Sequence, residues 1–224
     1  ACALVTTLDD GSCANTLFTF DGKETVGAPL NLWVEVEEAY EQRANKVIEK
    51  GGVSYFIHLF PRKPILLVIG AAHITADLVA MANDFGFETV VIDPRGFFTN
   101  NTVFQSPPSQ ILTDYPSEVL DRFPMDNYTY CAILSHDPKV DDNAIEYLLK
   151  TEVGYIGALG SRKRHERRRK KLIEQGYSVE TVDRIHGPIG EPIHSITAKE
   201  IALAIMSQIV KVKNQYQREF LKAR

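Results

Sequence analysis

The features of this sequence that could do chemistry lie where apolar runs end in glycine or in polar residues. Gly70-Ala71-Ala72-His73 follows the apolar run 65–69, and Asp93 closes the next apolar run. Free backbone N–H groups at the start of a helix attract anions, and an acid about 20 residues beyond such a turn can bind a ribose hydroxyl. The pattern predicts a nucleotide-like ligand. A ligand-free structural turn is the alternative, because Ala72 replaces the glycine that lets a pyrophosphate approach closely.

Two side chains beside this turn could add specificity. Arg95 lies two residues after Asp93 and could accept a 2′-phosphate. His73 could orient a ligand, or it could be only a local hydrogen-bonding residue in a tight turn.

The segment Ser135-His136-Asp137 directly follows another apolar run. Polar groups at the carboxyl ends of parallel strands face the ligand crevice, and His136 can exchange a proton near neutral pH. The structural alternative is that Asp137 only caps a helix that we predict to span 141–150.

A second anion cradle is predicted at Gly157-Ala158-Leu159-Gly160-Ser161-Arg162, where two glycines, a hydroxyl and a guanidinium precede a helix. We expect this turn to bind phosphate more tightly than the turn at Gly70, because Ala72 crowds the first site.

Eight of the ten residues from Arg162 to Lys171 are lysine or arginine. Such a run could bind nucleic acid, but aromatic stacking residues are not interleaved with it and the formal net charge of the chain is −4. We therefore interpret the run as a solvated helix face and expect no nucleic-acid partner.

The segment 184–190 lacks any amphipathic period and carries His186, Gly187 and Gly190 together with a proline. It predicts a stiff loop that presents His186 to a ligand, with a purely structural loop as the alternative.

The elements that must position these residues alternate between strand and helix from residue 63 onward. Apolar runs predict strands at 65–69, 89–92, 111–112, 130–134 and 153–156, and helical spacing predicts helices at 75–85, 116–123 and 141–150. A capping box at Thr197-Ala198-Lys199-Glu200 begins a long C-terminal helix. This α/β alternation predicts a Rossmann-like, doubly wound parallel sheet.

The first 62 residues are predicted to form a separate, small α+β domain, and residues 63–224 the Rossmann-like domain. Strands are expected at 3–8, 16–20 and 53–60, and a helix over 32–50 that Gly51-Gly52 terminates. Because Ala1 rather than methionine opens the chain, we expect a fragment with upstream sequence.

Bulk properties favour a reducing, aqueous compartment. No apolar run approaches the roughly 18 residues that span a membrane, and no secretory signal is visible. The three cysteines include no CxxC pair, so we expect no disulfide framework and a cytoplasmic location.

Taken together, these segments resemble the XdhC/CoxI family of xanthine dehydrogenase accessory proteins. The resemblance rests on the Gly-Ala-Ala-His turn with 93–95, on 135–137, on 155–162, on 184–190 and on 197–205, and it covers nearly all of 64–210. It implies a role in maturing molybdenum hydroxylases such as xanthine dehydrogenase: binding a molybdopterin-type cofactor, protecting it during sulfuration and passing it to the apo-enzyme. It further implies a cysteine desulfurase as partner and a homo-oligomer.

The cofactor-binding residues that we predict come from the turns described above, with no catalytic residue and no metal held by protein side chains. They are Gly70, Ala71, Ala72, His73, Asp93, Arg95, His136, Asp137, Gly157, Gly160, Ser161, Arg162, His186, Gly187 and Gly190. Two alternatives stay open on the same fold: an NAD(P)-dependent oxidoreductase and a regulatory nucleotide-binding module.

The chain departs from the family pattern near its start. Family members usually carry a glycine-rich segment with a cysteine just before the first long helix, whereas residues 26–31 read Val-Gly-Ala-Pro-Leu-Asn. Cys13 could stand in for that cysteine, or it could be an inert buried thiol. Since iron–sulfur clusters are typically held by four cysteines each, three cysteines in total also predict that this chain does not itself oxidise purines.

Overall fold

The computed structural model describes residues 1–8, 14–96 and 104–222, so Cys13 and its predicted role lie outside the described residues. The chain divides into two compact units, one formed by residues 63–213 and the other by residues 1–62 together with the chain from 214 onward. Among the described residues, no helix combines the length and the apolarity that crossing a lipid bilayer requires.

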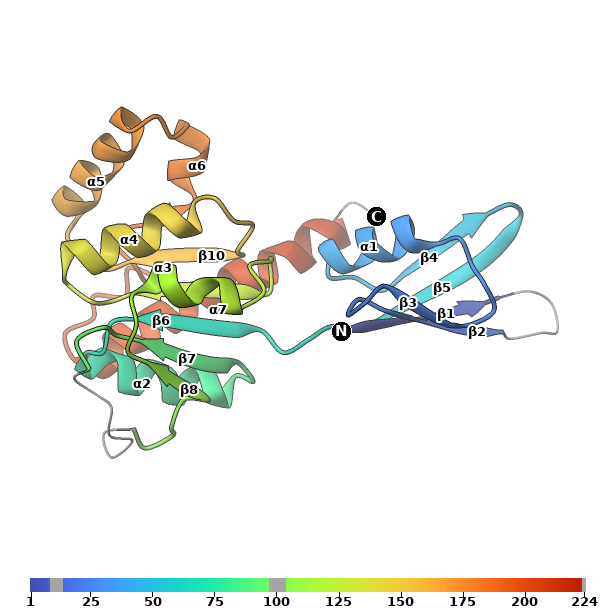
Figure 1. Cartoon of the computed structure of the whole chain (residues 1–224), viewed down its shortest axis with the longest axis horizontal. Helices are drawn as coiled ribbons and strands as arrows, with labels where there is room; N and C mark the ends of the chain where they lie inside the picture. Colours follow the sequence, from blue (N-terminus) through green and yellow to red (C-terminus); the bar gives the residue numbers. More distant parts are fainter. Residues whose placement is uncertain (9–13, 97–103, 223–224) are drawn as a thin grey trace. The chain divides into compact units, whose positions relative to one another are not determined.

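Residues 1–62, which we call the first unit, form an antiparallel sheet with one helix on it (Figure 1). Its strand order is β3-β2-β1-β5-β4, and its core is built from residues such as Val5, Phe18 and Ile57 of the sheet and Val36 of the helix. The elements are β1 Cys2–Thr7, β2 Asn15–Thr19, β3 Glu24–Gly27, α1 Trp33–Glu41, β4 Lys46–Lys50 and β5 Val53–Phe60.

The helix predicted over 32–50 is wrong in its second half, because α1 ends at Glu41 and β4 follows. Val47 and Ile48 are β-branched, and β4 pairs antiparallel with β5. Gly51 and Gly52 have φ angles of +64° and +79°, which suits a two-residue hairpin turn. The two glycines therefore connect strands rather than ending a helix.

The second unit is a six-stranded sheet in which every neighbouring pair of strands is parallel, with the order β11-β10-β9-β6-β7-β8. Counted along this unit, that order is 6-5-4-1-2-3, which is the Rossmann arrangement. The strands are β6 Ile65–Ile69, β7 Glu88–Ile92, β8 Gln110–Leu112, β9 Thr129–Ile133, β10 Tyr155–Ala158 and β11 Ile185–His186.

Helices cover both faces of this sheet, as the continuous apolar strands predict (Figure 1). The helices are α2 His73–Asp84, α3 Pro116–Val119, α4 Pro138–Leu148, α5 Arg162–Glu174, α6 Val179–Asp183 and α7 Ala198–Lys222. On one face, Leu67 and Ile69 pack with α3, α4, α5 and α6; on the other, Leu66 and Val68 pack with α2 and α7.

Two predicted helix boundaries shift for local reasons. The helix predicted at 141–150 begins at Pro138, because Asp137 caps it and a proline is well suited to the first helical turn. The helix predicted over 116–123 is α-helical only to Val119 and continues as a 3₁₀ turn, Leu120–Arg122.

The capping box predicted before α7 is present, since the Glu200 N–H donates to the Thr197 hydroxyl and the Glu200 carboxylate accepts from the Thr197 N–H.

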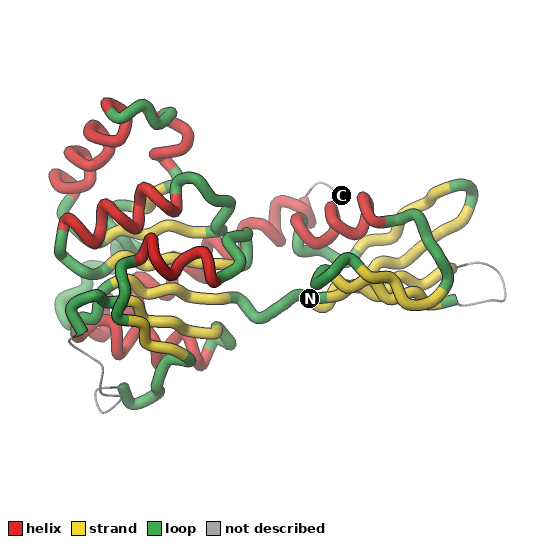
Figure 2. The backbone as a smooth tube through the Cα atoms, viewed as in Figure 1, coloured by secondary structure: helices red, strands yellow, loops and turns green. Residues whose placement is uncertain are grey.

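The parallel sheet places the connections that follow its strands along one edge (Figure 2). The chain leaves β6 toward β7 and β8, then returns across the sheet to β9 on the other side of β6. The point between β6 and β9 is therefore the topological switch point, outside which a Rossmann fold binds its ligands.

Candidate functional site

At the switch point, the first glycine turn packs directly against the loop that follows β9. Gly70 has a φ angle of +100°, and a Cβ atom added to it would collide with the backbone of Ser135. Glycine is therefore required here for two independent reasons, its backbone conformation and its close contact with the next strand end.

The backbone donors of this turn are already used inside the protein. The Gly70 N–H donates to the Ile92 carbonyl (2.8 Å), the Ala71 N–H to Oδ2 of Asp93 (2.6 Å) and the Ala72 N–H to the Thr75 hydroxyl (3.1 Å). That hydroxyl donates in turn to the Gly70 carbonyl (2.8 Å). A phosphate could reach only the N–H groups of His73 and Ile74, which have no acceptor in the described part of the chain.

Asp93 is 3% exposed and both of its carboxylate oxygens are saturated. Besides the Ala71 N–H, it accepts from the Arg95 N–H (2.9 Å), Nε (2.9 Å) and Nη2 (2.7 Å). Burial raises the pKa of Asp93, but these hydrogen bonds outweigh burial and hold the pKa below its usual value. A ribose hydroxyl could bind here only by replacing one of these donors.

Arg95 also reaches across the switch point, where its Nη1 donates to the Ser135 carbonyl (3.1 Å). The Asp93–Arg95 pair therefore connects the ends of β7, β6 and β9. The hydrogen bonds to Asp93 raise the already high pKa of Arg95, so the pair stays ionised. The pair holds the three strand ends together, and we call it the Asp93–Arg95 brace.

His73 and His136 stand exposed at the same edge. His136 follows β9 with a φ angle of +62°, a left-handed conformation in which non-glycine residues are uncommon. Asp137, next along the chain, accepts from the Lys139 N–H (2.9 Å) and is the N-cap of α4. The capping interpretation of Asp137 is thus confirmed, while a ligand role for His136 stays a prediction.

The second glycine turn follows β10 and has a side-chain cap at the start of its helix. Ser161 is the N-cap of α5 and accepts from the Arg164 N–H (3.2 Å), and Gly160 has a φ angle of +147°. Arg162 is exposed at the first position of the helix. Across residues 1–8, 14–96 and 104–222, the N–H groups of Arg162 and Lys163 have no acceptor, so they remain available to an anion.

The other predicted glycines are explained by close packing. A Cβ on Gly157 would collide with the Tyr155 hydroxyl and with Ile189, and one on Gly187 would collide with the His165 ring. The Gly190 N–H donates to Oε1 of Gln208 (2.9 Å), which also accepts from the Tyr155 hydroxyl (2.6 Å). The loop is held to α7 by these contacts.

His186 lies in the edge strand β11 and stacks on Tyr155, with ring centroids 4.9 Å apart. Burial lowers the pKa of His186. Four strand spacings separate β11 from β7, which amounts to about 19 Å at about 4.8 Å each. The fold thus brings His73, Asp93, Arg95 and His136 to the switch point, places Arg162 one strand further along, and leaves His186 remote from Asp93.

A buried charge cluster escaped the sequence analysis. Asp141 in α4 is 1% exposed and accepts from the Ser135 hydroxyl (2.5 Å) and from Arg164 Nη2 (3.0 Å). Nη2 of Arg168 lies 3.5 Å from the same carboxylate, and the Arg168 side chain is only 6% exposed. Burial raises the pKa of Asp141, and the Ser135 hydroxyl and the two arginines oppose that rise.

The interpretation of 162–171 as a solvated face is therefore wrong for Arg168 and half right for Arg164, whose side chain is 33% exposed. The spacing carried a signal, because Arg164, Arg168 and Leu172 follow one another at intervals of four, and Leu172 belongs to the core. No grouping of His, Cys, Asp and Glu side chains within the described residues could hold a metal ion.

The strand order and the parallel pairing define the second unit as a Rossmann-type domain. The family model described as the XdhC Rossmann domain matches residues 66–209, and the chain belongs to this family.

Relatives and one solved structure extend this finding. The chain is 31% identical to the uncharacterized protein YqeB of Escherichia coli K12 over 169 residues, which is 73% of the chain and 30% of YqeB. It is 26% identical to a probable xanthine dehydrogenase subunit from Bacillus subtilis 168 over 160 residues, 71% of the chain and 46% of that protein. It is 30% identical to the molybdenum cofactor insertion chaperone PaoD of Escherichia coli K12 over 107 residues, 45% of the chain and 34% of PaoD.

The chain therefore spans 30 to 46% of the length of these relatives. A crystal structure described as a xanthine dehydrogenase from Bacillus halodurans matches with a TM-score of 0.66 and 24% identity. The match covers 96% of this chain and 60% of that one, and at this identity it establishes the fold alone.

Proposed function

We propose that the chain is an accessory factor that binds a molybdopterin-type cofactor as cargo and delivers it to a molybdenum hydroxylase. The observation that carries the proposal is membership of the XdhC family, joined to the 30% identity with a protein named as a molybdenum cofactor insertion chaperone. In this proposal the chain has no turnover of its own, and the receiving enzyme is of the xanthine dehydrogenase class.

The donors along the sheet edge suit the phosphate end of such a cargo. The uncommitted N–H groups of Arg162 and Lys163, with the Arg162 guanidinium, form a cationic helix start that a phosphate can approach from solvent. The exposed imidazoles of His73 and His136 would face the heterocyclic end, where each can donate or accept a hydrogen bond. The Asp93–Arg95 brace holds these loops in register without contacting the cargo.

An NAD(P)-dependent oxidoreductase is the second candidate, because the strand order and an acid at the end of β7 are both features of dinucleotide-binding folds. The saturated carboxylate of Asp93 and the internally used donors of Ala71 and Ala72 weigh against it. A regulatory nucleotide-binding module would use the same edge.

Native mass spectrometry of the protein from a molybdenum-replete host separates these candidates. We expect a non-covalent, phosphate-bearing pterin species, which Arg162→Ala should lose and the charge-matched Lys170→Ala should keep. Retention of NAD or NADP in place of the pterin would favour the second candidate. A chain that carries no pterin and binds none when it is supplied would reject the proposal.

Reconstitution tests the delivery step. Added protein loaded with cofactor should restore activity to a cofactor-free xanthine dehydrogenase more than free cofactor does. The chain alone, given xanthine and NAD or an artificial acceptor, should show no sustained turnover, and multiple turnovers would overturn the accessory role.

A further inference from the structure

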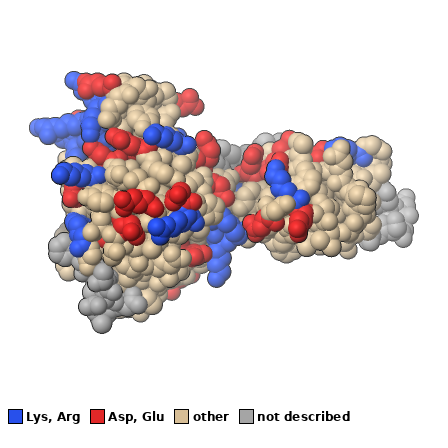
Figure 3. All heavy atoms as spheres, in the orientation of Figure 1, with Lys and Arg blue, Asp and Glu red and all other residues tan. Residues whose placement is uncertain are grey.

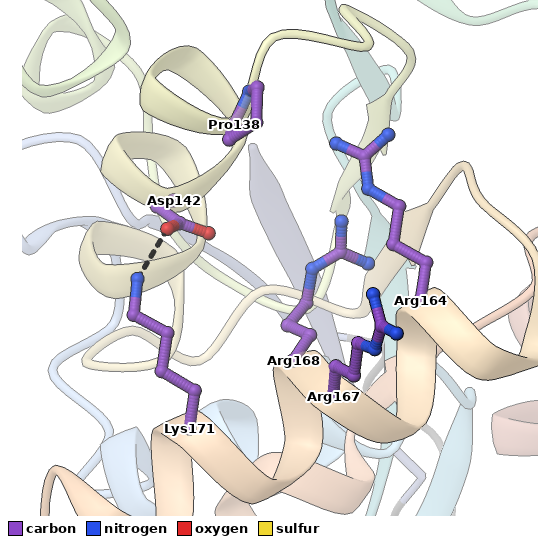
Figure 4. Close-up of a pocket in the computed structure, with 6 residues that line it drawn as sticks. All are labelled: Pro138, Asp142, Arg164, Arg167, Arg168 and Lys171. Atoms are coloured by element: carbon purple, nitrogen blue, oxygen red, sulfur yellow. Dashed lines mark hydrogen bonds and ion pairs between the residues drawn. The ribbon is translucent and has the colours of Figure 1, made fainter.

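A basic pocket lies between α4 and α5, beside the cluster of Asp141, Arg164 and Arg168 (Figure 4). Its volume is about 170 Å³, and it is lined by Pro138, Asp142, Arg164, Arg167, Arg168 and Lys171. Arginine and lysine side chains gather around α5 in the surface view (Figure 3). The three arginines and the lysine of the pocket all belong to α5.

The carboxylates nearby neutralise only part of this charge. Arg164 and Arg168 share the single carboxylate of Asp141, and Lys171 pairs with Asp142 at 2.5 Å. Arg167 is exposed and has no ion-pair partner within the described part of the chain. Among these residues, four cations and two carboxylates leave a surplus of two positive charges, which a phosphate dianion would neutralise; Glu146 acts on Lys171 from outside the pocket.

Arg168 provides a second and independent indication. Its side chain is 6% exposed, and its Nη1 is buried with no hydrogen-bond partner among the residues that the structure describes. An uncompensated buried donor is costly, and a buried guanidinium that shares its ion-pair carboxylate with a second arginine is costlier. Burial accordingly lowers the pKa of Arg168. An anion in the pocket would supply the missing negative charge.

We propose that this pocket is an anion site that binds one phosphoryl group between α4 and α5. It adjoins the loop after β9, since Arg164 Nη2 donates to the His136 carbonyl (3.4 Å), but it is built from side chains of α5 rather than from the backbone N–H groups of the strand-end turns. Arginine guanidinium groups match phosphate oxygens well, and Arg164, Arg167 and Arg168 approach the pocket from one helix face. The volume is below the range of pockets that enclose a whole drug-sized ligand, so it fits a single group, either free phosphate or the terminal phosphate of a larger molecule. This site goes beyond the proposed accessory function and does not depend on it.

Isothermal titration of the full chain with inorganic phosphate, at constant ionic strength, tests the proposal. We expect a saturable site that Arg167→Gln weakens about tenfold, the size expected for losing one charged hydrogen bond, in addition to any phosphate binding at the start of α5. Lys170→Gln removes the same charge from the same helix but outside the pocket, and it should change the affinity by less than about twofold. Both positions are exposed, so both variants should fold.

Two further experiments locate the site and identify which kind of phosphate it binds. Arg162→Ala should leave phosphate affinity at the pocket unchanged; if it removes binding while Arg167→Gln does not, the phosphate sits at the start of α5 and the proposal is overturned. Equal loss of affinity in Arg167→Gln and Lys170→Gln would show a general basic face and would overturn the proposal. So would displacement of phosphate by any oligonucleotide, if both variants weaken that displacement equally. A nucleoside monophosphate that binds more tightly than inorganic phosphate assigns the pocket to a terminal phosphate, and the reverse assigns it to the free anion.

Discussion

The two glycine turns of the Rossmann unit share a backbone pattern and differ in the charged side chains around them. Each follows a buried parallel strand and precedes a helix, and each has a glycine with positive φ, Gly70 and Gly160. In the first turn the N–H groups of Gly70, Ala71 and Ala72 are taken up by Ile92, Asp93 and Thr75, while those of His73 and Ile74 at the start of α2 have no acceptor in the described chain. In the second, a serine cap uses one donor at the start of α5 and leaves two others without an acceptor in the described chain.

The two turns differ instead in the charged side chains that surround the start of the helix. Asp93 arrives at the first turn from the neighbouring strand with a fixed negative charge, which does internally what a bound phosphate would do. At the α5 turn the buried acid of the neighbouring helix, Asp141, is instead engaged by Ser135, Arg164 and Arg168. The first turn therefore carries a buried carboxylate, whereas the second carries the exposed guanidinium of Arg162.

The largest expected effect is on folding. Gly70→Ala places a methyl group against the Ser135 backbone at a φ angle of +100°, and should cost about 4 kcal/mol in the free energy of unfolding. Gly160→Ala, the matched change in the other turn, meets only the flexible Arg164 side chain at 3.0 Å and should cost about 1–2 kcal/mol. Urea unfolding measures both; equal costs would contradict the comparison.

Asp93→Asn should be the next largest change. It removes the buried charge that accepts three hydrogen bonds from Arg95, whose side chain is 32% exposed, and should cost about 2 kcal/mol. The comparable replacement of a hydrogen-bonding side chain at the second turn, Ser161→Ala, should cost about 1 kcal/mol, as for loss of a helix N-cap. Thermal or urea unfolding compares the two variants. A cost for Asp93→Asn no greater than that for Ser161→Ala would mean that the first turn is not braced in this way.

For ligand affinity, in contrast to stability, we expect the larger effect at the second turn. Arg162→Ala should weaken binding of a phosphorylated pterin or nucleotide by about 1.5–3 kcal/mol, the range for a charged hydrogen bond. Ala72→Gly should change it by less than about 0.5 kcal/mol, since the Ala72 N–H stays bonded to Thr75. Titration calorimetry gives both values, and an unchanged dissociation constant in Arg162→Ala would reject the assignment.

The smallest effect concerns acid stability. The folded-state pKa of Asp93 is lowered, so its contribution to stability is complete above its unfolded pKa, about 4, and is lost as the pH falls through the lower folded value. The difference in stability between wild type and Asp93→Asn should therefore be constant from about pH 7 to about pH 5 and shrink below about pH 4. Denaturant unfolding across that range checks it; a difference that grows on acidification would contradict the sign.

Much of the Rossmann unit could be predicted from the chain, because parallel strands that are buried on both faces must be continuously apolar. The strand predicted at 65–69 has the observed bounds, and the strand predicted at 89–92 begins one residue earlier, at Glu88. The hairpin at Gly51-Gly52 could not be predicted in this way, because a short β-branched segment after a helix has no decisive period. The candidate residues could be found because turn composition is a local property of the chain.

The sequence by itself determined the alternation of strands and helices, the glycines at the turns and the cap of α4, because each depends on neighbours within a few residues. Only the tertiary structure decided that Asp93 and Arg95 neutralise each other beneath the first turn, that His186 lies about four strand spacings from them, and that Arg168 is buried beside Asp141. These outcomes depend on which strands become neighbours and which charges then meet, and pairing between segments far apart in the chain leaves no mark on the local pattern.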